Sequence, residues 1–335
     1  MKTLHIDKLN LILILASFTL ACFLPFELFL FGYAFLGPLH YLTESNWIAD
    51  KNYFVPNTYW KYLVLVAAII YSIPFVFSLS FVSEFINQST ISFVIYKMAK
   101  YTNFVLFFIL ISAVLALFYK TYKVFVISFL IAFILSFWTY TTEAYLLING
   151  LLLPTIIHVY VFTLLFMMYG VKNKKTIYGI LNIILIIALP LSLVFLDTEI
   201  FNYQFSDTVK NTYMNNNFHV LNANLAKLFG VYEDLKFFFY EKLDIKIQIF
   251  IAFAYIYHYL NWFSKTTIIG WHKQLTHKKA ILILGIWIAI LFCYLYDYRL
   301  GLVISIFLSV SHVMLEFPLN IITIRSLFSK RKKKT

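Results

Sequence analysis

Charged residues are scarce in this 335-residue sequence: Asp, Glu, Lys and Arg make up 13% of it, whereas hydrophobic residues make up 62%. A soluble domain carries about 25% charged and about 45–50% apolar residues. So few charges cannot cover a water-soluble fold, and hydrocarbon must be the solvent for much of the chain. We therefore predict an all-α, polytopic transmembrane helical bundle that forms a single integral membrane domain over residues 1–335.

Glycine and cysteine are also scarce, with nine and two residues. The sequence contains no glycine-rich phosphate loop, no Gly-x-Ser-x-Gly, no His-Glu-x-x-His and no paired-histidine boxes of the desaturase type. Cys22 and Cys293 lie inside apolar runs, which excludes a disulfide framework and a thiolate zinc cluster. No lysine lies in the middle of a predicted span, which disfavours a retinal Schiff base.

Long apolar runs dominate the sequence, and a bilayer core of about 30 Å needs about 20 helical residues to cross it. We predict eight or nine crossings. The candidate runs are residues 9–37, 60–83, 102–119, 122–140, 146–169, 176–196, 245–264, 280–296 and 300–322.

Lysine-rich loops indicate the cytoplasmic side of a membrane protein. Such loops occur at residues 172–175 and 265–279, and the sequence ends in a basic tail at 326–335. Successive members of this set are separated by two predicted spans each, as they must be if all are cytoplasmic. The lysine-rich loops of the second half therefore give one consistent orientation, with a cytoplasmic C-terminus. We predict a bacterial inner (plasma) membrane as the location of the protein.

The lysines of the first half do not give one consistent orientation in the membrane. Lys120 and Lys123 fit the cytoplasmic side, but this places the N-terminus outside, whereas Lys2 and Lys8 argue for the opposite. One of the first four runs is then interfacial or re-entrant, which would give eight crossings.

The regions outside the spans predict the partners of the chain. Residues 197–244 form the one long polar stretch, an external loop with a possible surface helix over Leu221–Tyr240. The basic tail predicts contact with anionic lipid rather than with nucleic acid. The expected partners are thus the lipid bilayer and a lipophilic small molecule.

Ionisable groups inside a membrane are rare and usually functional. His158, His258 and His312 lie within predicted spans, each about 12–13 residues after the external start of its span, which places all three about 18–20 Å below the outer surface. His40 stands at the end of the first run. The remaining histidines fall in polar loops, where a solvated surface residue is the ordinary interpretation: His5, His219, His272 and His277.

Imidazole groups at close quarters are the usual ligands of iron, copper, zinc or nickel. We predict one metal site formed by His40, His158, His258 and His312. Ligating histidines commonly bond a carboxylate or carbonyl through the second ring nitrogen, and the candidates for this role are Glu44, Asn261, Glu316 and Asn182. The alternative is that each histidine forms a hydrogen bond across a helix interface and binds no metal.

A multi-span protein of this size with four scattered intramembrane histidines resembles the Brp/Blh family of β-carotene dioxygenases. The resemblance covers architecture and histidine number. It implies non-haem iron (Fe) bound by histidines and an oxygenase that cleaves a polyene. His40 is flanked by Leu39 and Tyr41 instead of the family's Pro-His-Gly-type segment. We therefore carry over only metal ligation by histidine.

Two other functional classes stay open. One is a membrane electron-transfer protein in which two histidines ligate a non-covalent haem. The other is a non-enzymatic carrier, channel or assembly subunit. Metal content and an absorption spectrum separate the three.

Overall fold

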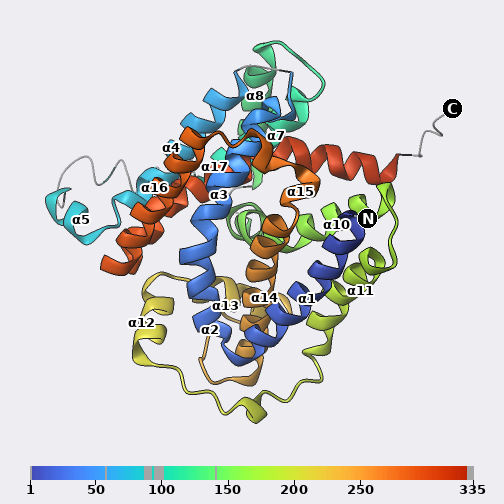
Figure 1. Cartoon of the computed structure of the whole chain (residues 1–335). Coiled ribbons are helices and arrows are strands. Elements are labelled where there is room, and N and C mark those ends of the chain that lie inside the picture. Colours follow the sequence, from blue (N-terminus) through green and yellow to red (C-terminus); the bar gives the residue numbers. More distant parts are fainter. Residues whose placement is uncertain (1, 57–58, 87–92, 94–101, 140–141, 330–335) are drawn as a thin grey trace. The chain divides into compact units, whose positions relative to one another are not determined.

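The computed structural model is helical throughout the part of the chain that it describes, where it contains no β-strand (Figure 1). The predicted all-α class is confirmed for these residues. The described residues are 2–56, 59–86, 93, 102–139 and 142–329. Residues 330–335 of the predicted basic tail lie outside these ranges.

Four helical segments in the described ranges are long and apolar enough to cross a membrane, judged by length and composition. This finding supports membrane association. The four are Thr3–Phe23, Glu143–Asn173, His277–Tyr296 and Tyr298–Phe328. Shorter apolar helices cover Trp60–Val76, Phe104–Ala116, Lys123–Trp138 and Ile177–Ser192.

The first predicted run, residues 9–37, is not one helix, and this prediction was wrong. Leu24 leaves the helical conformation, with φ −134° and ψ 59°, immediately before Pro25. A proline restricts the residue before it to extended conformations, so the helix ends there. His40 consequently lies inside a second helical run and not at the end of the first. The elements are α1 (Lys2–Phe23), α2 (Pro25–Phe31), the π-helix η1 (Gly32–Leu36) and α3 (Gly37–Asp50).

The chain forms two compact units, each of which is described by itself. The first unit comprises Met1–His40 and Thr155–Lys273, and the second comprises Tyr41–Pro154 and Gln274–Thr335. One boundary falls inside α3 and the other inside the π-helix η3 (Leu146–Phe162).

Helix α14 (Lys242–Ser264) forms the centre of the first unit, and all of its residues from 251 to 259 are buried. It packs against α1 and α2, while α11 (Ile177–Ser192) packs against α1 and α10 (Thr163–Asn173) (Figure 1). In Figure 1, α1 runs in the opposite direction to α2 and α14. The polar side chains of α14 therefore face other helices of its own unit. Two short elements follow α14, namely α15 (Thr266–Ile269) and η5 (Trp271–Gln274).

The polar stretch between α11 and α14 contains three short helices: η4 (Thr198–Phe201), α12 (Asp207–Asn215) and α13 (His219–Leu228). The predicted surface helix over Leu221–Tyr240 is helical only as far as Leu228. Gly230 then adopts a left-handed conformation with φ 72°, which ends a helix. The chain continues without regular structure to the start of α14.

In the second unit, α17 (Tyr298–Phe328) packs against α4, α7 and α16. The close approach of α16 and α17 requires a glycine, because a Cβ at Gly301 would lie 2.3 Å from the ring of Tyr294. Lys279 forms a salt bridge of 3.0 Å with Asp50. The other helices of this unit are η2 (Asn52–Phe54), α4 (Trp60–Val76), α5 (Ser80–Ile86), α7 (Thr102–Ala116), α8 (Lys123–Thr139), α9 (Glu143–Tyr145) and α16 (His277–Tyr296).

Candidate metal centre

His258 lies on the most buried helix of the first unit and makes two polar contacts there. Its Nδ1 lies 2.8 Å from Thr163 Oγ1 on α10. Its Nε2 lies 3.0 Å from Nε2 of His40 on α3. Both ring nitrogens therefore have partners inside the protein.

His40 follows a helical segment of unusual geometry. The π-helix η1 precedes α3, and such π-turns occur frequently at functional sites. Gly32 begins η1, and a Cβ placed there would lie 2.2 Å from Cδ1 of Ile256 on α14. The absence of a side chain thus lets η1 approach α14 two residues before His258. Tyr259, Trp262 and Phe263 of α14 surround the His40 ring.

His158 is positioned by a break in its helix. Pro154 lies inside η3, and Thr155 after it has non-helical torsion angles, φ −115° and ψ −105°. A proline in a helix removes one backbone hydrogen bond and distorts the preceding turn, which accounts for the kink here. The His158 ring lies 5.0 Å from that of His258, at an interplanar angle of 66°.

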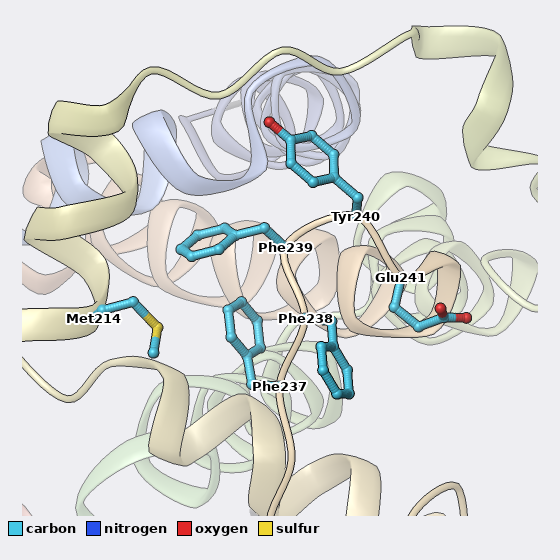
Figure 2. Close-up of a pocket in the computed structure, with 6 residues that line it drawn as sticks. All are labelled: Met214, Phe237, Phe238, Phe239, Tyr240 and Glu241. Atoms are coloured by element: carbon cyan, nitrogen blue, oxygen red, sulfur yellow. The ribbon is translucent and has the colours of Figure 1, made fainter.

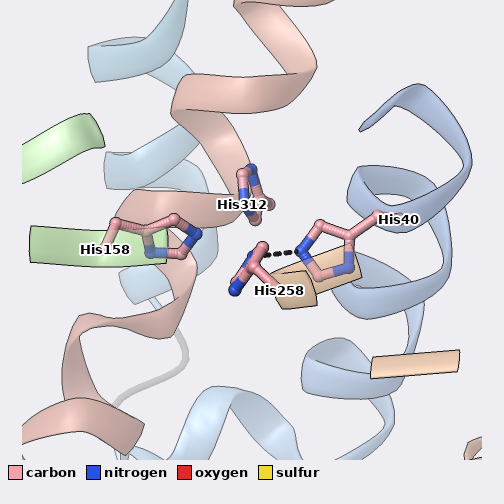
Figure 3. Close-up of side chains that lie close together, drawn as sticks. All are labelled: His40, His158, His258 and His312. Atoms are coloured by element: carbon pink, nitrogen blue, oxygen red, sulfur yellow. Dashed lines mark hydrogen bonds between the residues drawn. The ribbon is translucent and has the colours of Figure 1, made fainter. Parts of the chain in front are cut away.

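Three histidines from separate segments of the first unit thus converge. His40, His158 and His258 are 1%, 2% and 7% exposed. Each offers a ring nitrogen, and these nitrogens lie within 4.8 Å of one another (Figure 3). Imidazole-only donor sets suit transition-metal ions, whereas calcium and magnesium prefer oxygen.

The two Nε2 atoms 3.0 Å apart restrict the protonation of the His40–His258 pair. A neutral imidazole carries one ring proton, so one ring donates here and the other accepts, unless both present lone pairs to a cation. If Nδ1 of His258 donates to Thr163, its Nε2 lone pair is available to a metal ion. The pair therefore shares either a proton or a metal ion.

His312 belongs to the second unit, where it is 1% exposed and stacks on Tyr41 at a ring distance of 4.4 Å. Glu316 and Asn320, one and two turns further along α17, are buried as well. The spacing of His312, Glu316 and Asn320 places all three on one helix face. Glu44, one turn after His40 on α3, is also buried.

Two other residues predicted to support the histidines, Asn182 and Asn261, also belong to the first unit. Asn182 donates from Nδ2 to the backbone oxygen of Asp7 at 2.9 Å, so it secures α11 to α1. Asn261 is buried, and its Oδ1 accepts no hydrogen bond from the part of the chain that the structure describes. The side chain that does contact His258 is Thr163, which no sequence signal identified, because threonines within apolar spans usually bond their own backbone.

A separate pocket of about 500 Å³ opens in the polar segment of the first unit (Figure 2). None of the four buried histidines lines it, so it is distinct from the candidate metal centre. Its lining consists of Met214, Phe237, Phe238, Phe239, Tyr240 and Glu241.

Comparison of the chain with protein-family models, with curated proteins and with solved structures finds no match in any of the three.

Proposed function

We propose that this chain is a polytopic membrane protein that binds one transition-metal ion through His40, His158 and His258, with His312 as the fourth ligand. The observation that supports the proposal best is the convergence of three buried imidazoles, contributed by α3, η3 and α14, within one compact unit. A helix interface needs one polar pair for specificity; three imidazoles at one point exceed that need.

The measured spacing fits a coordination sphere. At a metal–nitrogen bond of about 2.1 Å, two ligands at right angles lie about 3.0 Å apart and two opposed ligands about 4.2 Å apart. The Nε2 atoms of His40 and His258 have the first of these separations. The ring nitrogens of His40, His158 and His258 all lie within 4.8 Å of one another, about 0.6 Å above the distance between opposed ligands.

The evidence for His312 as a ligand is separate from the evidence for the other three histidines. The sequence predicts it to lie at the same depth as His158 and His258 and to bind the same ion. It is buried within α17, on the face that also carries Glu316. A carboxylate one turn away suits the support of a ligating imidazole. We assign His312 to the fourth position on this basis.

We propose non-haem iron as the metal and oxygenation of a lipophilic, carotenoid-like substrate as the reaction. Histidine-bound iron with open positions supplies oxygen chemistry. The predicted position of the histidines within the membrane supports a lipophilic substrate, and the aromatic residues around His40 provide an apolar environment for it. The chain's own residues would bind the ion, exclude water and orient the imidazoles.

The geometry favours non-haem iron over haem. Two axial histidines of a haem bind on opposite faces of the iron, about 4 Å apart, with the macrocycle between them. Nε2 of His40 and Nε2 of His258 lie 3.0 Å apart in direct contact. No macrocycle fits between this pair.

We further propose ten membrane crossings, revising the eight or nine expected from the sequence. The break at Leu24 turns the first run into two segments, α1 and the continuous helical run from α2 to α3. This change puts Lys2 and Lys8 on the same side as Lys120, so the positions of these three lysines no longer conflict. Both termini are then cytoplasmic, in an inner membrane. The crossings are α1, α2–α3, α4, α7, α8, α9–α10, α11, α14, α16 and α17.

The test of the activity uses iron-loaded, detergent-purified protein mixed with β-carotene under air. We expect oxygen uptake and loss of carotenoid absorbance, abolished in His258→Ala and retained in His277→Ala. No oxygen uptake by iron-loaded protein with any lipophilic polyene would contradict the oxygenase assignment. A protein that binds no metal would instead be a carrier or assembly subunit.

A further inference from the structure

Asp244 in the first turn of α14 is a completely buried carboxylate without a basic partner. Its exposed fraction is 0%. Oδ2 accepts from the backbone N–H of Phe238 at 2.7 Å and from the hydroxyl of Tyr232 at 3.3 Å. Within the described residues Asp244 forms no ion pair, and its Oδ1 has no hydrogen-bond partner. An uncompensated charge at such a position is strongly destabilising.

Two buried amide side chains belong to residues adjacent to Asp244, one hydrogen-bonded to its backbone and one a turn further along α14. Asn222 of α13 is 0% exposed, donates from Nδ2 to the backbone oxygen of Asp244 at 2.8 Å, and its Oδ1 also has no partner. Gln248, one turn after Asp244 on α14, is 0% exposed, and its Oε1 accepts from Tyr213 at 2.6 Å. Asp244 Oδ1 and Asn222 Oδ1, which have no hydrogen-bond partner among the described residues, thus belong to a buried group of one carboxylate and neutral side chains.

The net charge of this group of buried side chains indicates which kind of ion it would bind. The other charged group that acts on Asp244 is the acidic Glu241, which adds to the need for a cation. One carboxylate balances one positive charge, and amide, hydroxyl and carboxylate oxygens are the ligands of hard cations. A divalent ion commonly takes several carboxylates, whereas this group has one.

We propose that Asp244, Asn222 and Gln248, with Tyr213 beside them, form a binding site for a monovalent cation, sodium, in the external segment of the first unit. The site is independent of the histidine centre. Because Asp244 also holds the backbone of Phe238, which lines the pocket in Figure 2, bound sodium stabilises the irregular segment before α14.

The experiment measures thermal unfolding of the full-length protein in detergent, in sodium chloride and in choline chloride at equal ionic strength. Wild type should show a saturable rise in Tm of at least about 2 °C in sodium, because a ligand that binds the folded state stabilises it. Asp244→Asn should abolish the rise. The matched control Asp207→Asn removes an exposed carboxylate of the same segment and should retain it.

Two results in the sodium and choline series would overturn the proposal, and one result with calcium would do so as well. One is a wild-type Tm that is identical in sodium and choline, which needs no variant and stands even if Asp244→Asn fails to fold. The other is a higher Tm of Asp244→Asn than of wild type in both salts at neutral pH, which identifies a protonated carboxyl. A rise with calcium but not with sodium would also contradict it.

Discussion

Nε2 of His258 and Nε2 of His40 lie 3.0 Å apart, although the two residues are separated by 218 positions in the sequence. One imidazole comes from the buried helix α14 and the other from the fourth position of α3, after a π-helix. Two lone pairs at this distance repel each other unless a proton or a metal ion lies between them. This relationship is the basis of the predictions that follow.

Replacement of a ligand should remove the metal. His258→Ala deletes the imidazole that contacts His40, so we expect metal content to fall to well under one tenth of wild type. His312→Ala should also abolish metal content if it supplies the fourth ligand. His219→Ala and His277→Ala, in the polar segments, serve as controls and should keep the wild-type content. Equal behaviour of all four variants would show that the buried positions have no special role.

The hydroxyl of Thr163 should tune the site through His258. Thr163→Val keeps the shape but removes the oxygen 2.8 Å from Nδ1, and partners of this kind are worth about 10–100-fold in metal affinity. We expect that loss in a competition titration with a metal chelator. Thr163→Ser, which retains the hydroxyl, should restore most of the affinity. A similar loss in both variants would indicate a packing effect instead.

Gly32 should be required for the approach of η1 to α14. A side chain there meets Ile256 at 2.2 Å, and overpacking of this kind costs about 1–3 kcal/mol. Gly32→Leu is therefore expected to lower Tm and weaken metal binding together. Gly170→Leu provides the control, since a Cβ at Gly170 meets no atom within 4 Å. Unchanged metal affinity in Gly32→Leu would separate helix packing from the site.

Lys265, directly after α14, should make stability depend on pH. Burial lowers its pKa to about 8, with partial compensation by Asp7. Because the unfolded chain keeps a lysine pKa of about 10.4, it binds more protons than the folded protein between these values. Stability from this residue therefore rises with pH across that window and is lowest below about pH 8.

The variant Lys265→Met should accordingly have a higher Tm than wild type at pH 7, and this advantage should disappear above about pH 10.5. The exposed Lys273→Met should change Tm little at either pH. A constant difference between Lys265→Met and wild type over the whole range would contradict the lowered pKa.

The break at Leu24 should be detectable from outside the cell. If α1 and α2 belong to different crossings, Leu24→Cys, in a background of Cys22→Ala and Cys293→Ala, reacts with a membrane-impermeant thiol reagent in intact cells. Lys172→Cys on the cytoplasmic side should react only after lysis. Protection of position 24 in both cases would restore a single span over residues 9–37.

Sequence reasoning could predict a large part of this arrangement, for physical reasons that differ between residues. The apolar runs after residue 60 lie within or overlap the observed helices, because hydrophobic length is the strongest signal in a membrane chain. His158 and His258 were assigned to one depth from lysine-rich loops, and the structure brings their rings together. The positions of the lysine-rich loops and the rise per residue of a helix are enough to predict the depth of these two histidines.

Other features had no readable signal. The end of α1 fell inside a run that was predicted as one span, and it follows from the conformational effect of Pro25 on Leu24. Asn182 has a suitable depth but faces α1, because depth does not specify which side of a helix a residue occupies. Thr163 contacts His258 through packing between helices distant in sequence, which spacing along one helix cannot predict.

The most direct test of the central claim is the metal content of the purified, full-length protein, measured together with its absorption spectrum. The histidine centre predicts close to one transition-metal ion per chain and no Soret band, with the ion lost in His258→Ala. A Soret band would replace non-haem iron with haem. Well under one metal ion per chain, without haem, would contradict the metal centre itself.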